Sequence, residues 1–434
     1  MATTTKYKTY PKYKPSGSDW LGNVPDGWET KRLRFLMTLQ KGKKPDETSE
    51  SVDGLPYLTM DFLRGQEEPT KYVPAPESVV VNDGDILLLW DGANAGEFVK
   101  GVKGILSSTM AEVSFGQREV DSRYRRYFLE SFEKKLRELT IGMGIPHVSG
   151  DIVKDCITPI PTDLEQKTIA DFLDRETAKI DDVVGKKQKL IELLKEERQA
   201  IITHAVTKGL DPKAKMKPSG IDWLGNIPTQ WGVKDLKYLL ERNDGGVWGE
   251  DFDDEGTPVL RSTEIDVDGN WKLDEFAKRK LTLEEKQKAL LKEGDLLITK
   301  SSGSELHIGK TALVTKEIED LECCFSNFMQ RLRPLKHVSS KLLFYFFNSY
   351  IAREQYNYFS QSTTGLANLS GDLFGQIIFV KIPEIEQRAI VSFLDRETAK
   401  IDDMIKKNEA QIEKLQEYRQ ALITSAVTGK IMVS

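Results

Sequence analysis

Phe172–Asp182 reads FLDRETAKIDD, and Phe393–Asp403 reads FLDRETAKIDD again, eleven identical residues at a separation of 221. The match extends upstream, where IPTDLEQKTIAD precedes the first copy and IPEIEQRAIVS precedes the second. It also extends downstream, where EERQAIITHAVTKG begins at Glu196 and EYRQALITSAVTGK begins at Glu417. Because self-similarity on this scale marks one structural unit used twice, we predict a chain built from two homologous halves.

A second repeated block opens each half. Lys14–Pro25 reads KPSGSDWLGNVP and Lys217–Pro228 reads KPSGIDWLGNIP, at a separation of 203. The middles diverge, although NDGDILLLW (82–90) still resembles KEGDLLITK (292–300). The alternative is neutral drift after a duplication, which would reduce the similarity between the two copies equally in all segments. We therefore expect different constraints on the matched ends and the divergent middles.

The segment from Leu164 to His204 predicts one long helix, because it holds a single glycine and is dense in Lys, Glu and Leu. Apolar residues recur there at spacings of four and three, which is typical of a coiled-coil seam. The two helices most simply pair with each other; separate packing of each on its own domain is the alternative. The seam positions are Ile180, Val184, Lys187, Ile191, Leu194, Arg198 and Ile201 in the first copy, and Ile401, Ile405, Asn408, Ile412, Leu415, Arg419 and Leu422 in the second.

The middles, Glu29 to Pro159 and Gly232 to Val380, have mixed patterns. VVVNDGDILLLW (79–90) predicts a β-hairpin with its turn at Asn-Asp-Gly-Asp. Residues 109–115 alternate like a strand, and residues 124–139 and 342–356 read as helices. The predicted class is α+β, with two mixed α/β domains and two long coiled-coil helices.

The order of the segments predicts how the halves connect. The linker between the halves has its counterpart split between the two ends of the chain. Bringing those ends together gives a cyclic arrangement of globule, helix, globule and helix with a pseudo-two-fold axis. The predicted boundaries are an N-terminal segment 1–28, a first globular domain 29–160, a first repeated helix 161–210, a linker 211–231, a second globular domain 232–381 and a second repeated helix 382–434.

The composition of the 434 residues bounds the protein class. With 62 Lys and Arg against 68 Asp and Glu, the net charge is −6, which argues against a small, uniformly basic nucleic-acid binder. Positive charge is nevertheless concentrated at Met1–Lys14 and Lys208–Lys217, with smaller basic clusters at residues 41–44 and 123–126. The three cysteines form no CxxC pair, and no apolar leader or membrane span is visible, so we expect a cytoplasmic protein.

Motifs for catalysis are missing. HIGKTALV, which begins at His307, resembles a phosphate-binding loop, but five residues rather than four separate Gly303 from Gly309. GxGxxG, HExxH and GxSxG are absent, and the four histidines show no metal-ligand spacing. The paired carboxylates Asp181-Asp182 and Asp402-Asp403 suit a contact surface better than a catalytic site. The sequence therefore disfavours an enzyme.

The DWLGN openings, the EQxxIxxFLDRETAKID helices and the AVTKG and AVTGK endings resemble the DNA-specificity subunit (HsdS, or S protein) of type I restriction-modification systems, which act in phage defence. The resemblance covers essentially the whole chain. It implies two target-recognition domains, each reading one half of a bipartite asymmetric DNA site. It also implies that the two long helices pair antiparallel and separate the two domains as a spacer. The seam from Ile180 to Ile201 would be roughly 33 Å long, close to one turn of B-DNA.

The resemblance also implies partners. Two methyltransferase (HsdM) subunits would dock on the repeated regions, and two restriction and translocase (HsdR) subunits would complete the complex. AdoMet, ATP and Mg²⁺ would belong to those partners, with no cofactor or metal on this chain. The candidate contacts with these partners are the repeated charged residues Asp174, Arg175, Glu176, Asp395, Arg396 and Glu397. The alternative is that these residues form an intramolecular salt-bridge network.

Candidate DNA-facing residues come from polar loops that follow strand ends, since base edges require donors and acceptors while lysine, serine and threonine suit phosphates. In the first domain they are Thr59, Asp61, Arg64, Trp90, Asn94, Lys100 and His147; in the second they are Arg261, Ser262, Thr263, Lys300, Ser302, Thr364 and Asn368.

Two other functions stay open at this point. One is an autonomous DNA methyltransferase or nuclease with fused recognition domains, which AdoMet-dependent methylation by the chain alone would establish. The other is a coiled-coil scaffold without a DNA function, which salt-dependent DNA retention by the assembled complex would exclude. From the uneven charge we expect only modest DNA affinity for the isolated chain.

Overall fold

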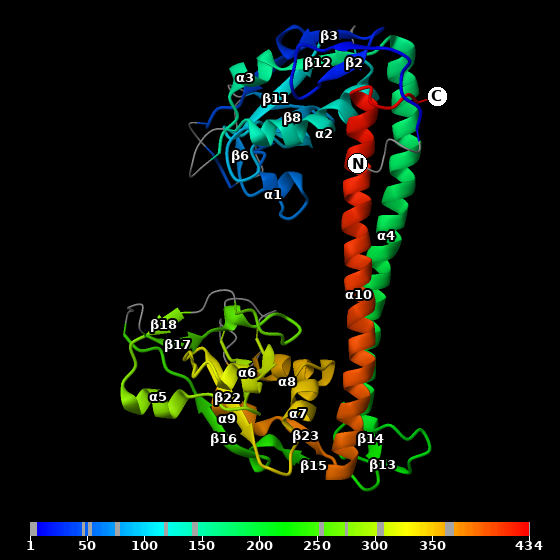
Figure 1. Cartoon of the computed structure of the whole chain (residues 1–434). Coiled ribbons are helices and arrows are strands. Elements are labelled where there is room, and N and C mark those ends of the chain that lie inside the picture. Colours follow the sequence, from blue (N-terminus) through cyan, green and yellow to red (C-terminus); the bar gives the residue numbers. More distant parts are fainter. Residues whose placement is uncertain are drawn as a thin grey trace. The chain divides into compact units, whose positions relative to one another are not determined.

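The computed structural model describes residues 7–45, 48–50, 54–73, 79–116, 120–140, 146–250, 256–273, 277–301, 308–360 and 369–433. The chain divides into two compact units (Figure 1). Unit 1 comprises Met1–Gln188 together with Glu409–Ser434, and unit 2 comprises Lys189–Asn408. Each unit contains one mixed α/β domain and a part of each of two long helices, α4 and α10.

Unit 1 is organised around an antiparallel four-stranded sheet in the order β4-β11-β8-β9. Apolar side chains of this sheet pack against the apolar face of α2 in one core, which includes Leu88, Val113, Tyr127 and Phe132. Short antiparallel pairs surround it: β1 with β2, β3 with β12, β5 with β6 and β7 with β10. The bounds are β1 Tyr13–Pro15, β2 Asn23–Pro25, β3 Glu29–Arg32, β4 Met37–Lys41, β5 Leu55–Pro56, α1 Met60–Leu63, β6 Tyr72–Val73, β7 Val80–Val81, β8 Ile86–Leu89, β9 Phe98–Lys100, β10 Gly104–Ile105, β11 Met110–Phe115, α2 Ser122–Glu138, α3 Gly150–Asp155 and β12 Ile157–Ile160, with a 3-10 turn at Leu33–Phe35.

Unit 2 repeats this design. Its four-stranded sheet has the order β16-β22-β19-β20, and its core includes Leu296, Leu332, Phe346 and Phe379. Strand β17 pairs with β18 and β21, β15 with β23, and β13 with β14. The bounds are β13 Met216–Pro218, β14 Asn226–Pro228, β15 Gly232–Asp235, β16 Leu240–Gly245, β17 Thr257–Leu260, β18 Ala277–Arg279, α5 Leu283–Ala289, β19 Leu296–Thr299, β20 Thr311–Leu313, α6 Lys316–Glu319, β21 Cys324–Phe325, β22 Met329–Pro334, α7 Ser340–Phe347, α8 Tyr350–Ser360, α9 Gly371–Gln376 and β23 Ile378–Lys381, with 3-10 turns at Leu236–Tyr238 and Ser262–Glu264.

The predicted strand at 109–115 and helix at 124–139 are confirmed as β11 and α2. The β-hairpin predicted at 79–90 is wrong. Asn82 N donates to Asp85 Oδ2 at 2.7 Å in a tight turn, but β7 then pairs with β10, whereas β8 pairs with β9 and β11. Val81 shares a small core with Leu87 and Leu89, whereas Ile86 and Leu88 belong to the core beneath α2. The backbone partners of β7 and β8 therefore come from other strands, and the two strands do not pair with each other.

The single helix predicted at 342–356 is also wrong, because α7 ends at Phe347 and α8 begins at Tyr350. The Asn348 side chain donates to Phe344 O and to Thr311 O, both at 3.0 Å. The Ser349 hydroxyl donates to Phe346 O at 2.6 Å. The Asn348 side chain thus satisfies a carbonyl of the last turn of α7, whereas the Ser349 bond has its equivalent, from Ser131 to Phe128 O, inside the continuous helix α2.

The long helices are α4, Asp163–Lys208, and α10, Glu384–Val427. They run in opposite directions wherever they meet within a unit (Figure 1). In unit 1 Arg419 pairs with Asp181, and Lys187 donates to Gln411. In unit 2 Arg198 pairs with Asp402. Six of the predicted seam residues are buried, namely Ile180, Ile191, Leu194, Ile401, Ile405 and Leu422. The other apolar seam residues are half-buried, namely Val184, Ile201, Ile412 and Leu415.

The DWLGN loops hold the helix ends in both units. In unit 1 Lys430 Nζ donates to Leu21 O at 2.6 Å and to Asn23 O at 2.5 Å. In unit 2 Lys208 Nζ donates to the equivalent carbonyls of residues 224 and 226 at 2.8 and 2.6 Å. Burial lowers the pKa of both lysines.

The two end segments of the chain lie together in unit 1, as the split linker predicts. Met432 N donates to Lys8 O at 2.7 Å, and the Tyr13 hydroxyl donates to Gly429 O at 3.0 Å. Among the helices described, none is long and apolar enough to cross a membrane.

Candidate nucleic-acid interface

The ends of the central strands β8 and β19 carry the same backbone arrangement. Val148 N donates to Trp90 O in unit 1, and Leu369 N donates to Lys300 O in unit 2, each at 2.8 Å. A serine and the short helix α3 or α9 follow in each case. The strand end and the segment before the short helix therefore meet at one edge of each sheet, where two loops can face a ligand.

In unit 1 this edge combines an aromatic ring with a cation. Lys41 Nζ lies 5.4 Å from the centre of the Trp90 ring and 3.0 Å from Asp91 Oδ2. His147 is exposed and forms a backbone bridge with Asp91. The face of an indole ring can stack on bases, and the charge of a lysine beside it can contact phosphates. The structure thus brings the predicted residues Trp90 and His147 together.

A second polar cluster gathers around Glu97. Arg64 Nη2 lies 2.8 Å and Arg137 Nη2 lies 3.7 Å from Glu97 Oε2, and Asn94 O accepts the Glu97 N–H at 3.2 Å. These contacts join Arg64 with Asn94. Thr59 caps α1, accepting from Phe62 N at 3.1 Å.

Two predicted residues of the first domain lie differently. Asp61 is exposed on α1. Lys100 lies on the edge strand β9, where it faces α2 rather than the Trp90 edge. Both remain predictions as DNA contacts, but Lys100 belongs to a different surface from Trp90 and His147.

In unit 2 the predicted residues at 261–263 shape their own turn. Arg261 Nη2 and the Thr263 hydroxyl each lie 2.7 Å from Oε1 of the buried Glu264. Ser262 O accepts from Lys310 Nζ at 2.9 Å. Lys300 is half-buried beside Gly245, and burial lowers its pKa. Ser302, Thr364 and Asn368 lie outside the described residues.

Some residues of this region were missed in the candidate set. Lys41 and Asp91 complete the Trp90 cluster, and the Arg279 guanidinium lies 3.9 Å from the centre of the Trp248 ring. The basic run at 41–44 could have indicated Lys41, because it directly follows a strand. Asp91 and Arg279 carried no such signal, since only the fold brings each to its partner.

The repeated charged residues divide into two groups. Asp174 accepts from the Tyr127 hydroxyl at 2.7 Å and from Arg126 at 2.8 Å, and Asp395 accepts from the Tyr345 hydroxyl at 2.6 Å and from Lys341 at 2.7 Å. Partial burial opposes ionisation of Asp174, but the Tyr127 hydroxyl and the arginines hold the pKa of its carboxyl below the usual value. These two aspartates fasten each long helix to its own domain.

The other group combines exposed arginines and lysines with a half-buried glutamate, and its residues are identical in the two units. Arg175 and Lys179 flank Glu176 at 3.1 and 2.8 Å, and their counterparts Arg396 and Lys400 flank Glu397 at 2.8 and 3.0 Å. Each arginine lies 5.6 Å from the centre of a phenylalanine ring, Phe172 or Phe393.

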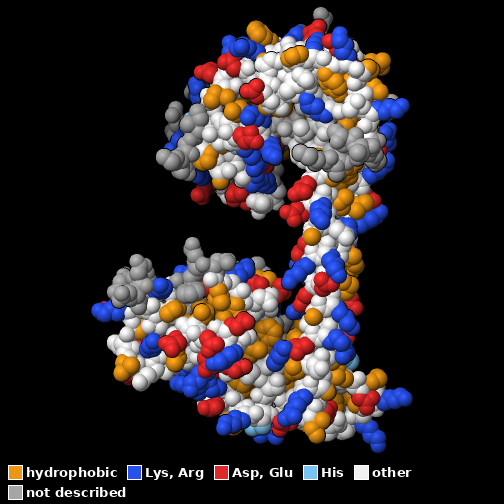
Figure 2. Space-filling view, in the orientation of Figure 1, with side chains coloured by type: hydrophobic (Ala, Val, Ile, Leu, Met, Phe, Trp, Pro, Cys, Tyr) orange, Lys and Arg blue, Asp and Glu red, His pale blue; other side chains and the backbone are white. Residues whose placement is uncertain are grey.

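The two groups therefore fit different uses. The intramolecular network accounts for Asp174 and Asp395. The trios are also ion-paired within the chain, through Glu176 and Glu397, but their arginines and lysines are exposed, so a contact with a partner stays a prediction there. On the face drawn in Figure 2, side chains of both charges are interspersed along the long helices.

Comparisons with known proteins agree with this duplicated design. A model of the type I restriction modification DNA specificity domain matches residues 25–193 and again residues 228–414. The chain is 29% identical over 424 residues to the type I restriction enzyme MjaVIII specificity subunit of Methanocaldococcus jannaschii, covering 94% of each chain. It is 24% identical over 441 residues to the EcoKI specificity subunit of Escherichia coli K12, covering 94% of this chain and 90% of that one.

A solved chain, from work on complex assembly and conformational transition of the type I R-M system, has the same fold. It superposes with a TM-score of 0.60 at 16% identity and covers 93% of this chain and 98% of that chain. Two matches to one domain model span most of the sequence, and each falls on one α/β domain with its adjoining helix. The chain therefore belongs to the type I restriction-modification DNA specificity family and carries that family's domain twice.

Proposed function

We propose that this chain reads a bipartite, asymmetric DNA site, with one half-site for each α/β domain. The carrying observation is the duplicated domain with divergent sequence at the Trp90 edge and its counterpart. Trp90 corresponds to Lys300, because each directly follows one of the equivalent strands β8 and β19. Lys41 corresponds to Gly245, because each precedes a glycine, Gly42 or Gly246, that packs tightly against backbone carbonyls. Equivalent positions with different donors and acceptors would select different base pairs.

The paired helices α4 and α10 would act as an antiparallel coiled-coil spacer between the two readers. Support comes from reciprocal contacts: Arg198 pairs with Asp402, and its repeat counterpart Arg419 pairs with Asp181, the counterpart of Asp402. Such an exchange is the signature of a two-fold relation between equivalent surfaces. A pseudo-two-fold axis would let the two domains approach one duplex in equivalent ways.

The chain itself would be non-catalytic and would work in the cytoplasm with partners. Two methyltransferase subunits would bind the exposed trios that include Arg175 and Arg396, because a partner that binds twice needs two equivalent surfaces. Those subunits would flip and methylate adenines using AdoMet. Two restriction and translocase subunits would supply the ATP- and Mg²⁺-dependent steps.

Footprinting of the complex with its methyltransferase subunits tests this function. Two protected half-sites separated by an unprotected or weakly protected gap are expected. One short continuous footprint would overturn the two-reader proposal. AdoMet-dependent methylation by the purified chain alone would instead establish an autonomous methyltransferase.

The charge substitutions Arg175→Glu and Arg396→Glu test the partner surface. Each should weaken co-purification of the methyltransferase subunit, and the double variant should abolish it. Lys186→Glu is a matched control, because Lys186 lies on the same helix and its side chain is 75% exposed. Unchanged co-purification of the double variant would remove the exposed trios from the partner surface.

A further inference from the structure

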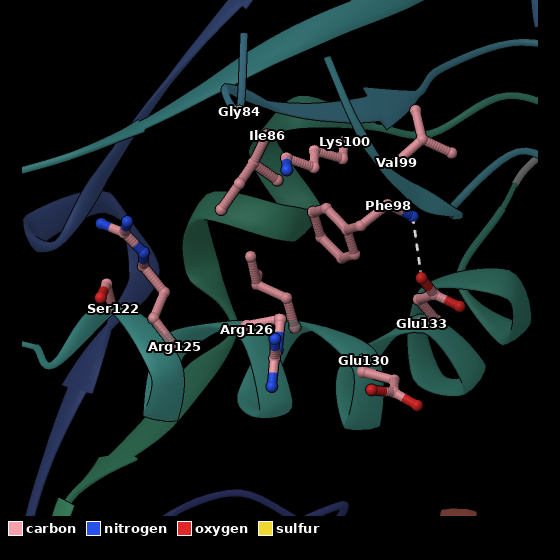
Figure 3. Close-up of a pocket in the computed structure, with 11 residues that line it drawn as sticks. Gly84, Ile86, Phe98, Val99, Lys100, Ser122, Arg125, Arg126, Glu130 and Glu133 are labelled. Carbon is pink, nitrogen blue, oxygen red and sulfur yellow. Dashed lines mark hydrogen bonds between the residues drawn. The ribbon is translucent and has the colours of Figure 1, made fainter. Parts of the chain in front are cut away.

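Unit 1 contains a cavity of about 610 Å³ between the edge strand β9 and helix α2. Phe98, Val99 and Lys100 line it from the strand, and Arg125, Arg126, Glu130 and Glu133 line it from the helix (Figure 3). The cavity is therefore bounded by a sheet edge on one side and by charged side chains on the other.

The equivalent place in unit 2 can be identified residue by residue. Tyr127 and Tyr345 make the same bond to Asp174 and Asp395, so α7 corresponds to α2. Strand β20 corresponds to β9, because each is the edge strand beside the equivalent strands β19 and β8. Lys100 thus corresponds to Leu313, Phe98 to Thr311, Arg126 to Phe344 and Glu130 to Asn348.

In unit 2 the chain itself fills this place. Trp271 Nε1 donates to Leu313 O at 2.7 Å. Gly269, with φ +83°, packs so closely that a Cβ there would collide with Thr311 O and lie 2.8 Å from the Phe344 ring. The turn Ile265–Trp271 therefore covers the edge of β20 and the face of α7. It is acidic, since it carries Asp266 and Asp268.

Of the cations at the unit 1 cavity, Arg126 is paired with Asp174, whereas Arg125 and Lys100 form no ion pair among the described residues, although the charge of Asp121 acts on Arg125. Arg125 Nε is buried without a hydrogen-bond partner there, and its guanidinium lies 4.7 Å from the centre of the Phe115 ring. Lys100 is exposed and has no ion pair among the described side chains. The two carboxylates are already engaged, Glu130 with Arg419 and Glu133 with the Phe98 N–H at 2.9 Å.

We propose that this cavity binds an acidic, turn-forming segment of another protein chain, in the position that Ile265–Trp271 occupies in unit 2. A carboxylate of the segment would pair with Arg125 or Lys100, and an N–H donor would reach Lys100 O as Trp271 reaches Leu313 O. A DNA phosphate suits the site less well, because a phosphate diester has no donor for the backbone carbonyl of Lys100, whereas Trp271 donates to the equivalent carbonyl of Leu313. This docking site goes beyond the proposed function and depends only on the comparison of the two units.

A peptide with the sequence of residues 265–272, IDVDGNWK, acetylated and amidated at its ends and labelled with a fluorophore, is the probe. Fluorescence anisotropy with the full chain should show saturable binding of one peptide per chain, since unit 2 holds its own turn. Lys100→Glu and Arg125→Gln should each weaken binding about tenfold, as expected for loss of a charge-assisted hydrogen bond. Lys167→Gln, an exposed lysine on α4, should leave binding unchanged.

Two control peptides sharpen the test. Replacing both Asp with Asn should weaken binding to the wild-type chain, and the difference should shrink in Lys100→Glu. Lys100 is exposed, so this variant is informative even where Arg125→Gln impairs folding. Absence of saturable peptide binding, or equal binding to all variants, would overturn the proposal. Displacement of the peptide by duplex DNA at low salt, with loss of DNA affinity in Lys100→Glu, would assign the cavity to DNA instead.

Discussion

Arg198 Nε donates to Asp402 Oδ1 at 2.9 Å, and the repeat counterparts of these residues, Arg419 and Asp181, make the same bond at the same distance. Each bond joins a residue of the first repeat to a residue of the second. Both arginines occupy predicted seam positions, where their side chains are only 13% and 25% exposed. Paired charges at these positions fix the register of α4 against α10.

The Arg198–Asp402 pair should therefore contribute to stability through direct coupling. Alanine substitution of Arg198 should lower the free energy of unfolding by about 1–3 kcal/mol, because a partly buried carboxylate loses its partner. A double-mutant cycle with Asp402→Ala, followed by urea unfolding, should give a coupling energy of about 0.5–1.5 kcal/mol. Arg388→Ala, whose side chain is 79% exposed, serves as the control. Strict additivity of Arg198→Ala and Asp402→Ala would contradict a register-fixing bond.

Removal of the lysine cap of each DWLGN loop should loosen the helix ends. Lys208→Ala and Lys430→Ala each leave two carbonyls without their donor, at a cost of about 1–2 kcal/mol. Hydrogen exchange should accelerate in residues 21–25 for Lys430→Ala and in residues 224–228 for Lys208→Ala. If either variant accelerated hydrogen exchange equally in residues 21–25 and 224–228, a local role of the substituted lysine would be contradicted.

The bond between Asp174 and Tyr127 predicts a pH dependence. The folded-state pKa of Asp174 lies below its unfolded value of about 3.9. Its stabilising contribution is thus fully present above that unfolded value and is lost as the pH falls through the lower folded value. Unfolding of wild type and Asp174→Asn, measured from pH 6 to pH 2.5, should differ most at pH 6 and converge in acid. A difference that grows in acid would contradict the assignment.

The Trp90 edge should affect one half-site only. Trp90→Ala and Lys41→Ala should weaken DNA binding by the assembled complex and relax base preference in one half of the motif. If Lys41 contacts a phosphate, its removal should also make the plot of the logarithm of the DNA-binding constant against the logarithm of the salt concentration less steep, by about one in slope. Lys134→Ala, which removes an exposed lysine on α2 of the same domain, is the matched control. Equal relaxation of both half-sites would contradict separate readers.

The buried cysteines should be inert. Burial raises the pKa of Cys323 to about 12 and that of Cys324 to about 11. Thiolates, not thiols, react with disulfide reagents. Ellman's reagent at pH 8 should therefore label neither cysteine rapidly in the native chain, and both should react after addition of guanidinium. Fast labelling of the native chain at Cys323 would contradict their burial.

The sequence predicts the parts of the fold that local physics determines. Seven-residue periodicity predicted that Ile180, Ile191 and Leu194 are buried on α4, and the split linker predicted that the two end segments meet. The prediction of a hairpin at 79–90 is wrong because long-range packing, rather than the turn, determines where the Val81 and Ile86 side chains are buried. The break at Asn348 depends on Thr311 O, which lies far away in sequence and gives no local signal.

The candidate site was less predictable than the fold. Their loop positions predict Trp90 and His147 as DNA contacts, but the proximity of these two residues depends on the hydrogen bond from Val148 N to Trp90 O. Arg261 and Thr263 were chosen by the same rule and instead bind the buried Glu264. A polar residue after a strand can face a ligand or stabilise its own turn, and only tertiary contacts distinguish the two.

The central claim is that two readers, held apart by α4 and α10, recognise one DNA site. The most direct measurement is genome-wide mapping of methylated adenines in cells that carry the methyltransferase partner with and without this chain. We predict a methylated motif that requires the chain and consists of two defined ends around an unspecified gap. Insertion of one heptad into each helix, after Gln188 and after Asn408, should lengthen that gap by about 3 base pairs and leave both ends unchanged. A single continuous motif, or methylation independent of the chain, would contradict the account.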